Sequence, residues 1–439
     1  MRYPQMYRLR QQFDRTCVRD VAAKVRDDLA SLQLASVICS GDRVAITAGS
    51  RGITSIDVIL RGIVDFVREL GGEPFVVPAM GSHGGATADG QRQVLASFGI
   101  TPDSMGCPIR SSMETVLVCQ SDEGVDIHFD RQAYEADHVI VCNRIKLHTD
   151  FSGQIQSGLM KMMLIGLGKH TGASIYHRAF RDHSFDAIAK SVSARVIKQC
   201  NVIAGVAIIE NGYEQTAMIR AIKPETISSI EPDLLKQSTL WMPRLPFADI
   251  DVLIVDEIGK NISGTGMDTN VVGRKRNENR ATAGETPCIG KIVVRDLTDQ
   301  THGNATGIGV ADFTTQKVID KMDYAATRVN CVTSGRTAVA MIPIYYPTER
   351  ESIEAALSTC GLTPPKDARV VWIRNTRELE HLCCSAALLN EIADQADVDI
   401  IGDSFAMSFD EHGQLQTEER EIESTAKDTQ QKGRRPTQP

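Results

Sequence analysis

From Asp42 onward, short apolar runs alternate with longer stretches in which apolar residues recur at helical spacing. Residues 44–47 form the first apolar run, and residues 56–70 follow with apolar positions three and four apart before two glycines. A second run at 75–77 precedes a stretch that Thr87 can cap and that extends to Phe98. This order predicts strands followed by helices, with glycine-rich loops after the strands.

Strand-like runs and helical spacing continue along the chain. Strands are predicted at 116–119, 125–129, 139–142, 202–209, 252–255, 292–294, 339–342 and 370–373, and helices at 185–199 and 349–357. The run at 202–209 is long enough for a strand buried on both faces. The pattern favours two α/β domains, and because ligands gather where strands end, it predicts an interdomain active-site cleft.

The expected boundaries follow from where this pattern begins, pauses and stops. We expect an N-terminal extension (1–15), a catalytic and cofactor-binding α/β domain (16–246), a second α/β domain (247–408) and a disordered tail (409–439). The extension shows no clear period, and the tail is rich in charge and has no aromatic residue after Asp410.

Composition narrows the class of protein and its surroundings. With 48 Lys and Arg against 56 Asp and Glu, the net charge is −8, so binding to nucleic acid or anionic lipid is not expected. We expect no membrane span and no secretory signal, because no run is apolar and long enough. Eleven cysteines without a Cys-x-x-Cys pair favour a reducing, cytoplasmic setting over disulfides or a zinc–thiolate site.

Histidines are placed unevenly, and six of the ten lie between His128 and His183. His128 and His138 lie in or beside strand-like runs, and we interpret both as structural. His83 is better placed, because glycines flank it in a loop after a strand, where its ring could approach a ligand. A purely structural role for His83 is equally compatible with the pattern.

Other candidate residues also follow strands. His148 could take a proton from a hydroxyl group, and Arg144 could hold an anion or be a solvated charge. Lys161 lies among apolar residues, where desolvation would favour a neutral nucleophile, although a surface lysine fits the context as well. Lys169 is followed by His170 rather than by Ser or Thr, so the P-loop interpretation fails.

Two basic residues are suited to an anionic substrate. Arg51 follows the first strand, and arginine binds a carboxylate through two parallel hydrogen bonds. Lys260 follows the first strand of the second domain and lies in a polar, glycine-containing loop. An ordinary polar loop at Lys260 is the competing interpretation.

Four of these positions, taken in order, resemble a known family. Ser157, Gly158 and Lys161 form a Ser-Gly-x-x-Lys motif, His177 follows sixteen residues later, and Arg51 and the Gly-Ser-His83 loop precede it. Over roughly residues 15–405 the chain resembles the lactate racemase family, whose members use a nickel-pincer nucleotide. The resemblance implies an isomerase, a racemase or epimerase of a small-molecule 2-hydroxy acid, that depends on cofactor-biosynthesis enzymes as partners.

The resemblance also implies residue roles. Lys161 would hold the pyridinium mononucleotide covalently through a thioamide, with Ser157 and Gly158 beside it, and His177 would be the protein ligand to nickel. His83 and His148 would be the two acid/base groups. Arg51, Arg144 and Lys260 would bind the substrate, which would pass through a 2-keto acid.

The chain departs from the family at several pocket positions. Ala48 stands where the family has an aspartate, Gly84 stands where an arginine usually follows the first histidine, and a Tyr-Gln pair is not evident in the second domain. The spacing from His148 to Lys161 is about three residues longer than in the family. We therefore expect a larger or more polar 2-hydroxy acid than lactate, and a neighbour of His148 could be the second acid/base group.

Two other classes of function remain open. One is a zinc- or manganese-dependent lyase or hydrolase that acts on an anionic small molecule. The other is a non-catalytic binding protein for an organic acid.

Overall fold

The computed structural model describes residues 1–416 and divides into two compact units. Among the described residues, the N-terminal unit contains 13–242, and the C-terminal unit contains 1–12 and 243–416. Both units combine helices with parallel-rich sheets, so the predicted α/β fold class is confirmed. The predicted interdomain cleft stays a prediction.

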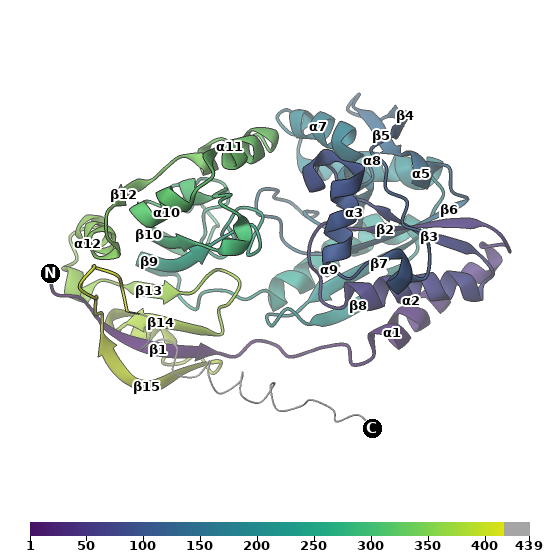
Figure 1. Ribbon diagram of the computed structural model, residues 1–439. Helices are drawn as coiled ribbons and strands as arrows, with labels where there is room; N and C mark the ends of the chain where they lie inside the picture. The colour runs from purple at the N-terminus through teal and green to yellow at the C-terminus, as the bar shows by residue number, and fades with distance from the viewer. Residues whose placement is uncertain (417–439) are drawn as a thin grey trace, which may run out of the picture. The chain divides into compact units, whose positions relative to one another are not determined.

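A five-stranded sheet forms the centre of the N-terminal unit (Figure 1). Its strands, in spatial order, are β3 (Glu73–Pro78), β2 (Arg43–Ala48), β6 (His138–Arg144), β7 (Val202–Glu210) and β8 (Thr216–Ile222). The first four are parallel, and β8 is antiparallel to β7. Seven of the nine residues of β7 are buried, which confirms a strand covered on both faces.

Helices lie on both faces of this sheet. The helices of the unit are α1 (Val21–Ala30), α2 (Ile56–Glu69), α3 (Ala88–Ser97), α4 (Pro102–Met105), α5 (Arg131–Tyr134), α6 (Leu159–Lys161), α7 (Lys169–Ala179), α8 (Phe185–Gln199) and α9 (Ile227–Trp241). Ile46 of β2 packs in the same apolar cluster as Ile59 of α2, whereas its neighbour Ala45 packs with Leu159 and Ile188 of α6 and α8. Alternate residues of one strand thus face two helical layers.

Local sequence explains the best-defined helix of this unit. In α2, Ile56, Ile59, Ile63 and Val67 repeat at three- and four-residue spacing, and all are buried. The helix ends before Gly71, whose φ of +88° suits glycine. A hairpin of β4 (Thr115–Gln120) and β5 (Asp126–Asp130) completes the unit.

An eight-stranded sheet forms the C-terminal unit. Its spatial order is β12 (Ile344–Tyr346), β11 (Phe313–Thr315), β10 (Cys288–Leu297), β9 (Asp249–Ile258), β13 (Val370–Ile373), β14 (His381–Ser385), β1 (Gln5–Gln11) and β15 (Val398–Ala406). The first five strands are parallel, and the others pair antiparallel.

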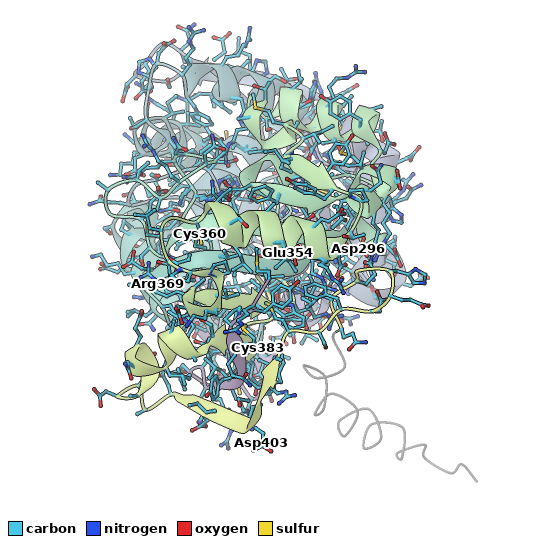
Figure 2. The ribbon with its side chains drawn as sticks, turned by 90° about the vertical axis from the view of Figure 1, so that its left-hand side faces the viewer. Asp296, Glu354, Cys360, Arg369, Cys383 and Asp403 are labelled. Atoms are coloured by element: carbon cyan, nitrogen blue, oxygen red, sulfur yellow. The ribbon has the colours of Figure 1, made fainter. Side chains whose placement is uncertain are left out.

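Up to residue 416, the α-helices of this unit are α10 (Gln316–Lys321), α11 (Tyr324–Thr333), α12 (Glu349–Thr359) and α13 (Leu389–Ile392). Figure 2 shows α12, marked by Glu354 and Cys360, packed on the sheet, and Asp403 on β15. Thr348 and Glu351 form a reciprocal capping box at the start of α12, which fixes where the helix begins.

Three sequence predictions need correction. Residues 5–11, expected within an extension, form β1 between β14 and β15, and the purple strand is visible beside its yellow-green neighbours in Figure 1. Residues 339–342 form no strand; a 3₁₀ turn spans Ala338–Ala340, and the strand begins only after Pro343. Residues 409–416, expected in the tail, carry an isolated bridge between Phe409 and Leu415. The rest of the expected tail lies outside the described residues.

Within residues 1–416, no helix is long and apolar enough to cross a membrane.

Candidate active site in the N-terminal unit

The carboxyl ends of three neighbouring strands carry the predicted site residues. Arg51 follows β2, His83 follows β3, and Arg144 ends β6. Because β3, β2 and β6 are adjacent and parallel, their following loops share one edge of the sheet. The Ser50 hydroxyl is in hydrogen-bond contact with Nδ1 of His83, so the loops after β2 and β3 touch.

The two arginines at this edge differ in their partners. Arg144 forms a close ion pair with Glu210 of β7, and Glu210 also accepts the Thr54 main-chain N–H at 2.7 Å. Within the described residues, no carboxylate pairs with Arg51. Loss of surrounding water and then the charge of Arg144 lower the pKa of Arg51, although arginine stays charged at neutral pH. Of the two arginines, Arg144 is therefore the one whose charge is balanced by a carboxylate.

The buried side-chain amide of Gln91 anchors the loop that carries His83. The Gln91 side chain donates to the main-chain carbonyls of Gly81 at 3.0 Å and His83 at 3.3 Å. The loop turns through Gly84 at a φ of +66°, and a Cβ there would lie 2.6 Å from the main-chain nitrogen of Gln91. The exposed imidazole of His83 thus stands on a fixed loop.

A buried ion pair supports the same loop. The fully buried ammonium of Lys169 lies 3.0 Å from Asp130 and donates to Gln91 at 3.2 Å and to the carbonyl of Pro78. This environment explains why Lys169 is no phosphate-binding lysine, as its sequence context indicated. A cation buried with its carboxylate connects α7, β5 and the His83 loop.

His148 lies in a turn after β6, and its own backbone fixes the ring. Nδ1 of His148 accepts the main-chain N–H of Asp150 at 3.0 Å and that of Phe151 at 3.2 Å. The ring stacks on Phe151 with centroids 4.2 Å apart and planes 13° apart. Its main-chain N–H donates to Oε1 of the buried Gln156 at 3.0 Å.

Lys161 ends the short helix α6 where a π-helical turn, Met162–Gly166, begins. Such turns occur frequently at functional sites. Burial, followed by repulsion from Arg51, lowers the pKa of Lys161 from 10.5 to about 7, while Asp150 opposes the shift. Its Nζ lies 5.4 Å from the ring centre of Phe151. A large share of Lys161 is therefore neutral and nucleophilic near pH 7.

Ser157 and Gly158 lead into α6, and close packing fixes this segment. The Asn143 side chain donates to the Gly158 carbonyl at 2.8 Å. A Cβ on Gly158 would lie 2.3 Å from Oε1 of Glu231, a buried carboxyl on α9 whose Oε2 accepts the Met160 N–H at 3.1 Å. A side chain at position 158 would therefore displace the buried carboxyl of Glu231.

His177 lies on α7 near the same aromatic ring. Its ring centre is 6.3 Å from that of Phe151 and 5.8 Å from that of Phe180. Burial and then the charge of Lys161 lower the pKa of His177, so its imidazole is neutral at physiological pH and has a lone pair for a metal. Lys161, His148 and His177 thus surround Phe151.

The other histidines of this region have structural roles or lie at the surface. His128 contacts Thr115 at 3.1 Å within the β4–β5 hairpin, and His138 pairs with Asp42 at 3.1 Å. Both agree with the structural interpretation. His170 and His183 are exposed.

Lys260 lies in the C-terminal unit, after β9. Its Nζ donates to the Gly264 carbonyl at 2.6 Å and to Asn330 of α11 at 2.7 Å. These bonds hold the loop against α11, and the substrate-binding role of Lys260 stays a prediction.

Three residues that shape this site could not be identified from sequence patterns: Gln91, Phe151 and Glu231. Each acts through contacts with residues on other elements or through packing, and none lies in a recognisable motif. The sequence hints at two of them only by proximity, because Phe151 lies close to His148 and Gln91 lies close to His83. Within residues 1–416, no three His, Cys, Asp or Glu side chains are grouped to hold a metal ion.

Comparisons with known proteins agree with this architecture. Residues 37–228 match the sequence model of a family described as a domain of unknown function (DUF362). No protein with a curated description matches the chain. The structure of the lactate racemase apoprotein from Thermoanaerobacterium thermosaccharolyticum is similar, with a TM-score of 0.52 and 15% identity over 84% of this chain and 93% of that chain. The chain therefore has a lactate racemase-like fold.

Proposed function

We propose that this protein is a racemase or epimerase of a 2-hydroxy acid and that it uses a nickel-pincer nucleotide bound to Lys161. One observation carries the proposal: Lys161, whose pKa is lowered to about 7, and His177, whose pKa is also lowered, both lie beside the ring of Phe151. The lactate racemase-like fold supports the same conclusion.

The residues present fit this cofactor. A covalent bond needs an unprotonated amine, which the lowered pKa of Lys161 provides. A pincer brings three donor atoms of its own, so a single neutral imidazole, His177, suffices as the protein ligand. When bound, the cofactor supplies the hydride chemistry that converts a 2-hydroxy acid into a 2-keto acid and back.

The chain's own residues would bind the substrate and move its proton. Arg51 would hold the carboxylate through two parallel hydrogen bonds. His83, exposed on its fixed loop, would receive the hydroxyl proton and later return it. His148 would contact a substrate oxygen from the loop after β6.

The substrate is expected to differ from lactate. In the observed loop an arginine at position 84 would need a φ of +66° and would overlap the backbone of Gln91. The charge that the family usually places there is absent, and Ala48 lacks the family's carboxylate. A larger or more polar 2-hydroxy acid is therefore the first class to test, with Arg144 and Lys260 as additional candidate ligands.

The test is intact-mass and metal measurement on protein coexpressed with the cofactor-biosynthesis enzymes. We expect a covalent adduct with nickel on the wild type, loss of both in Lys161→Ala, and retention in Lys190→Ala, which changes an exposed lysine on α8. An adduct that survives in Lys161→Ala, or bound zinc or manganese with no adduct, would contradict the proposal.

A further inference from the structure

We infer that the two site histidines have unequal roles: His148 is a fixed proton-bearing donor through Nε2, and His83 alone accepts the substrate proton. The assignment of these roles rests on the proposed function, but the state of the His148 ring does not. The state of this ring follows from two main-chain hydrogen bonds.

Backbone amides only donate, so an atom that accepts from them must offer a lone pair. Nδ1 of His148 accepts from both Asp150 and Phe151, at 3.0 Å and 3.2 Å. A neutral imidazole has one N–H, and with Nδ1 unprotonated that proton is on Nε2. The structure therefore selects one tautomer of His148.

The surroundings keep the ring in this orientation. A half-turn of the ring would place a carbon against both amide N–H groups and would leave them without their acceptor. The stack on Phe151 restricts the plane of the ring, and the bond from the main-chain N–H to Gln156 anchors the turn. Protonation of Nδ1 would set three N–H groups against one another.

His148 in this state has no lone pair with which to accept a proton at Nε2. It can donate a hydrogen bond to a developing negative charge on a substrate oxygen while it keeps its own proton. His83 differs, because its Nδ1 contacts the Ser50 hydroxyl, which can donate or accept, so this contact selects no single tautomer. His83 can therefore present a lone pair to the substrate, take the hydroxyl proton to become imidazolium, and later return that proton.

The first test measures the tautomer in the full chain without cofactor. Histidine labelled with ¹⁵N is observed by multiple-bond ¹H–¹⁵N NMR at mildly alkaline pH, and His148→Gln assigns the signal. We expect a single Nε2–H pattern for His148, whereas exposed His183 should show mixed tautomers. A mixed or Nδ1–H pattern for His148 would overturn the inference.

The second test uses the cofactor-loaded enzyme with a substrate that it turns over. His83→Gln should abolish proton transfer, with a loss of at least about 10²-fold in kcat, while His148→Gln should lower kcat and keep the wild-type pH profile. His183→Gln is the matched control and should behave as wild type. Loss of the basic limb of the pH profile in His148→Gln would overturn the role. If nickel or the adduct is absent from the wild type, the proposed function fails, and the NMR result still decides the tautomer.

Discussion

The buried carboxyl of Glu231 should make the N-terminal unit less stable as pH rises. Burial raises the pKa of Glu231 from 4.5 to about 7, although Oε2 accepts main-chain N–H groups at the start of α6. Within the described residues, Oε1 has no hydrogen-bond partner. The side chain is 1% exposed, so solvent screening is small. The folded state therefore favours the protonated carboxyl.

The sign and size follow from linkage between folding and proton binding. The unfolded chain releases this proton near pH 4.5 and the folded chain near pH 7, so stability falls across that window and is constant above it. At about 1.36 kcal/mol per pKa unit, the change between about pH 5 and about pH 8.5 is about 2–3 kcal/mol. Glu231→Gln keeps an acceptor for the Met160 N–H and removes the titration.

Urea unfolding at the two pH values measures this difference. Trp241 lies on α9, the helix of Glu231, and a Trp372→Phe background restricts the fluorescence to the N-terminal unit. We expect the wild type to lose about 2–3 kcal/mol more than Glu231→Gln between the two pH values. Glu225→Gln, at an exposed position just before α9, should match the wild type. Equal pH dependence in the wild type and Glu231→Gln would refute the reasoning.

Three other predictions follow from the same unit. Lys161, with a pKa of about 7, should react with an amine-specific acylating reagent at neutral pH faster than an ordinary lysine, because its unprotonated fraction is about 10³-fold larger, and Arg51→Gln should slow the reaction by raising that pKa. Peptide mass spectrometry measures the labelling, and equal labelling of Lys161 and surface lysines would contradict the prediction. Lys169→Met should destabilise the unit by about 3–5 kcal/mol, because the carboxylate of Asp130 would stay buried without a counter-charge. Thermal unfolding measures this loss, and an unchanged Tm would contradict the role of the ion pair. Gly84→Ala should lower stability more than Gly85→Ala. Both positions have a positive φ, which costs about 1–2 kcal/mol for alanine, but only a Cβ at position 84 would overlap the backbone of Gln91. Equal losses of stability in the two variants would contradict a fixed His83 loop.

The periodic parts of the fold were predictable from sequence because local burial patterns generate them. The helix at 56–70 and the strand at 202–209 agree with α2 and β7. β1 was missed because its pairing depends on strands more than 360 residues later and because a register shift between Met6 and Arg8 breaks its alternation. The prediction of a strand at 339–342 was wrong because the apolar residues Val339 and Ala340 are buried in a 3₁₀ turn instead.

The site was predictable where topology alone brings residues together. Arg51 and His83 follow adjacent parallel strands, so their proximity required only the correct strand order. The roles of Phe151 and Glu231 could not be predicted from sequence. Phe151 acts by stacking on the ring of His148, and Glu231 acts by its close approach to Gly158. The tautomer of His148 depends on the shape of one turn, which hydrophobic spacing does not encode.

The place of β1 has a consequence for how the polypeptide is put together. Residues 13–242 are inserted into the C-terminal unit, between its first strand and the rest of its sheet. During synthesis the inserted unit can fold before β14 and β15, the two strands that pair with residues 5–11, have been translated. A fragment that starts at Pro243 would leave β14 and β15 without the strand that joins them, and would expose two edges open to intermolecular pairing. The inserted unit, residues 13–242, is the fragment better suited to independent expression.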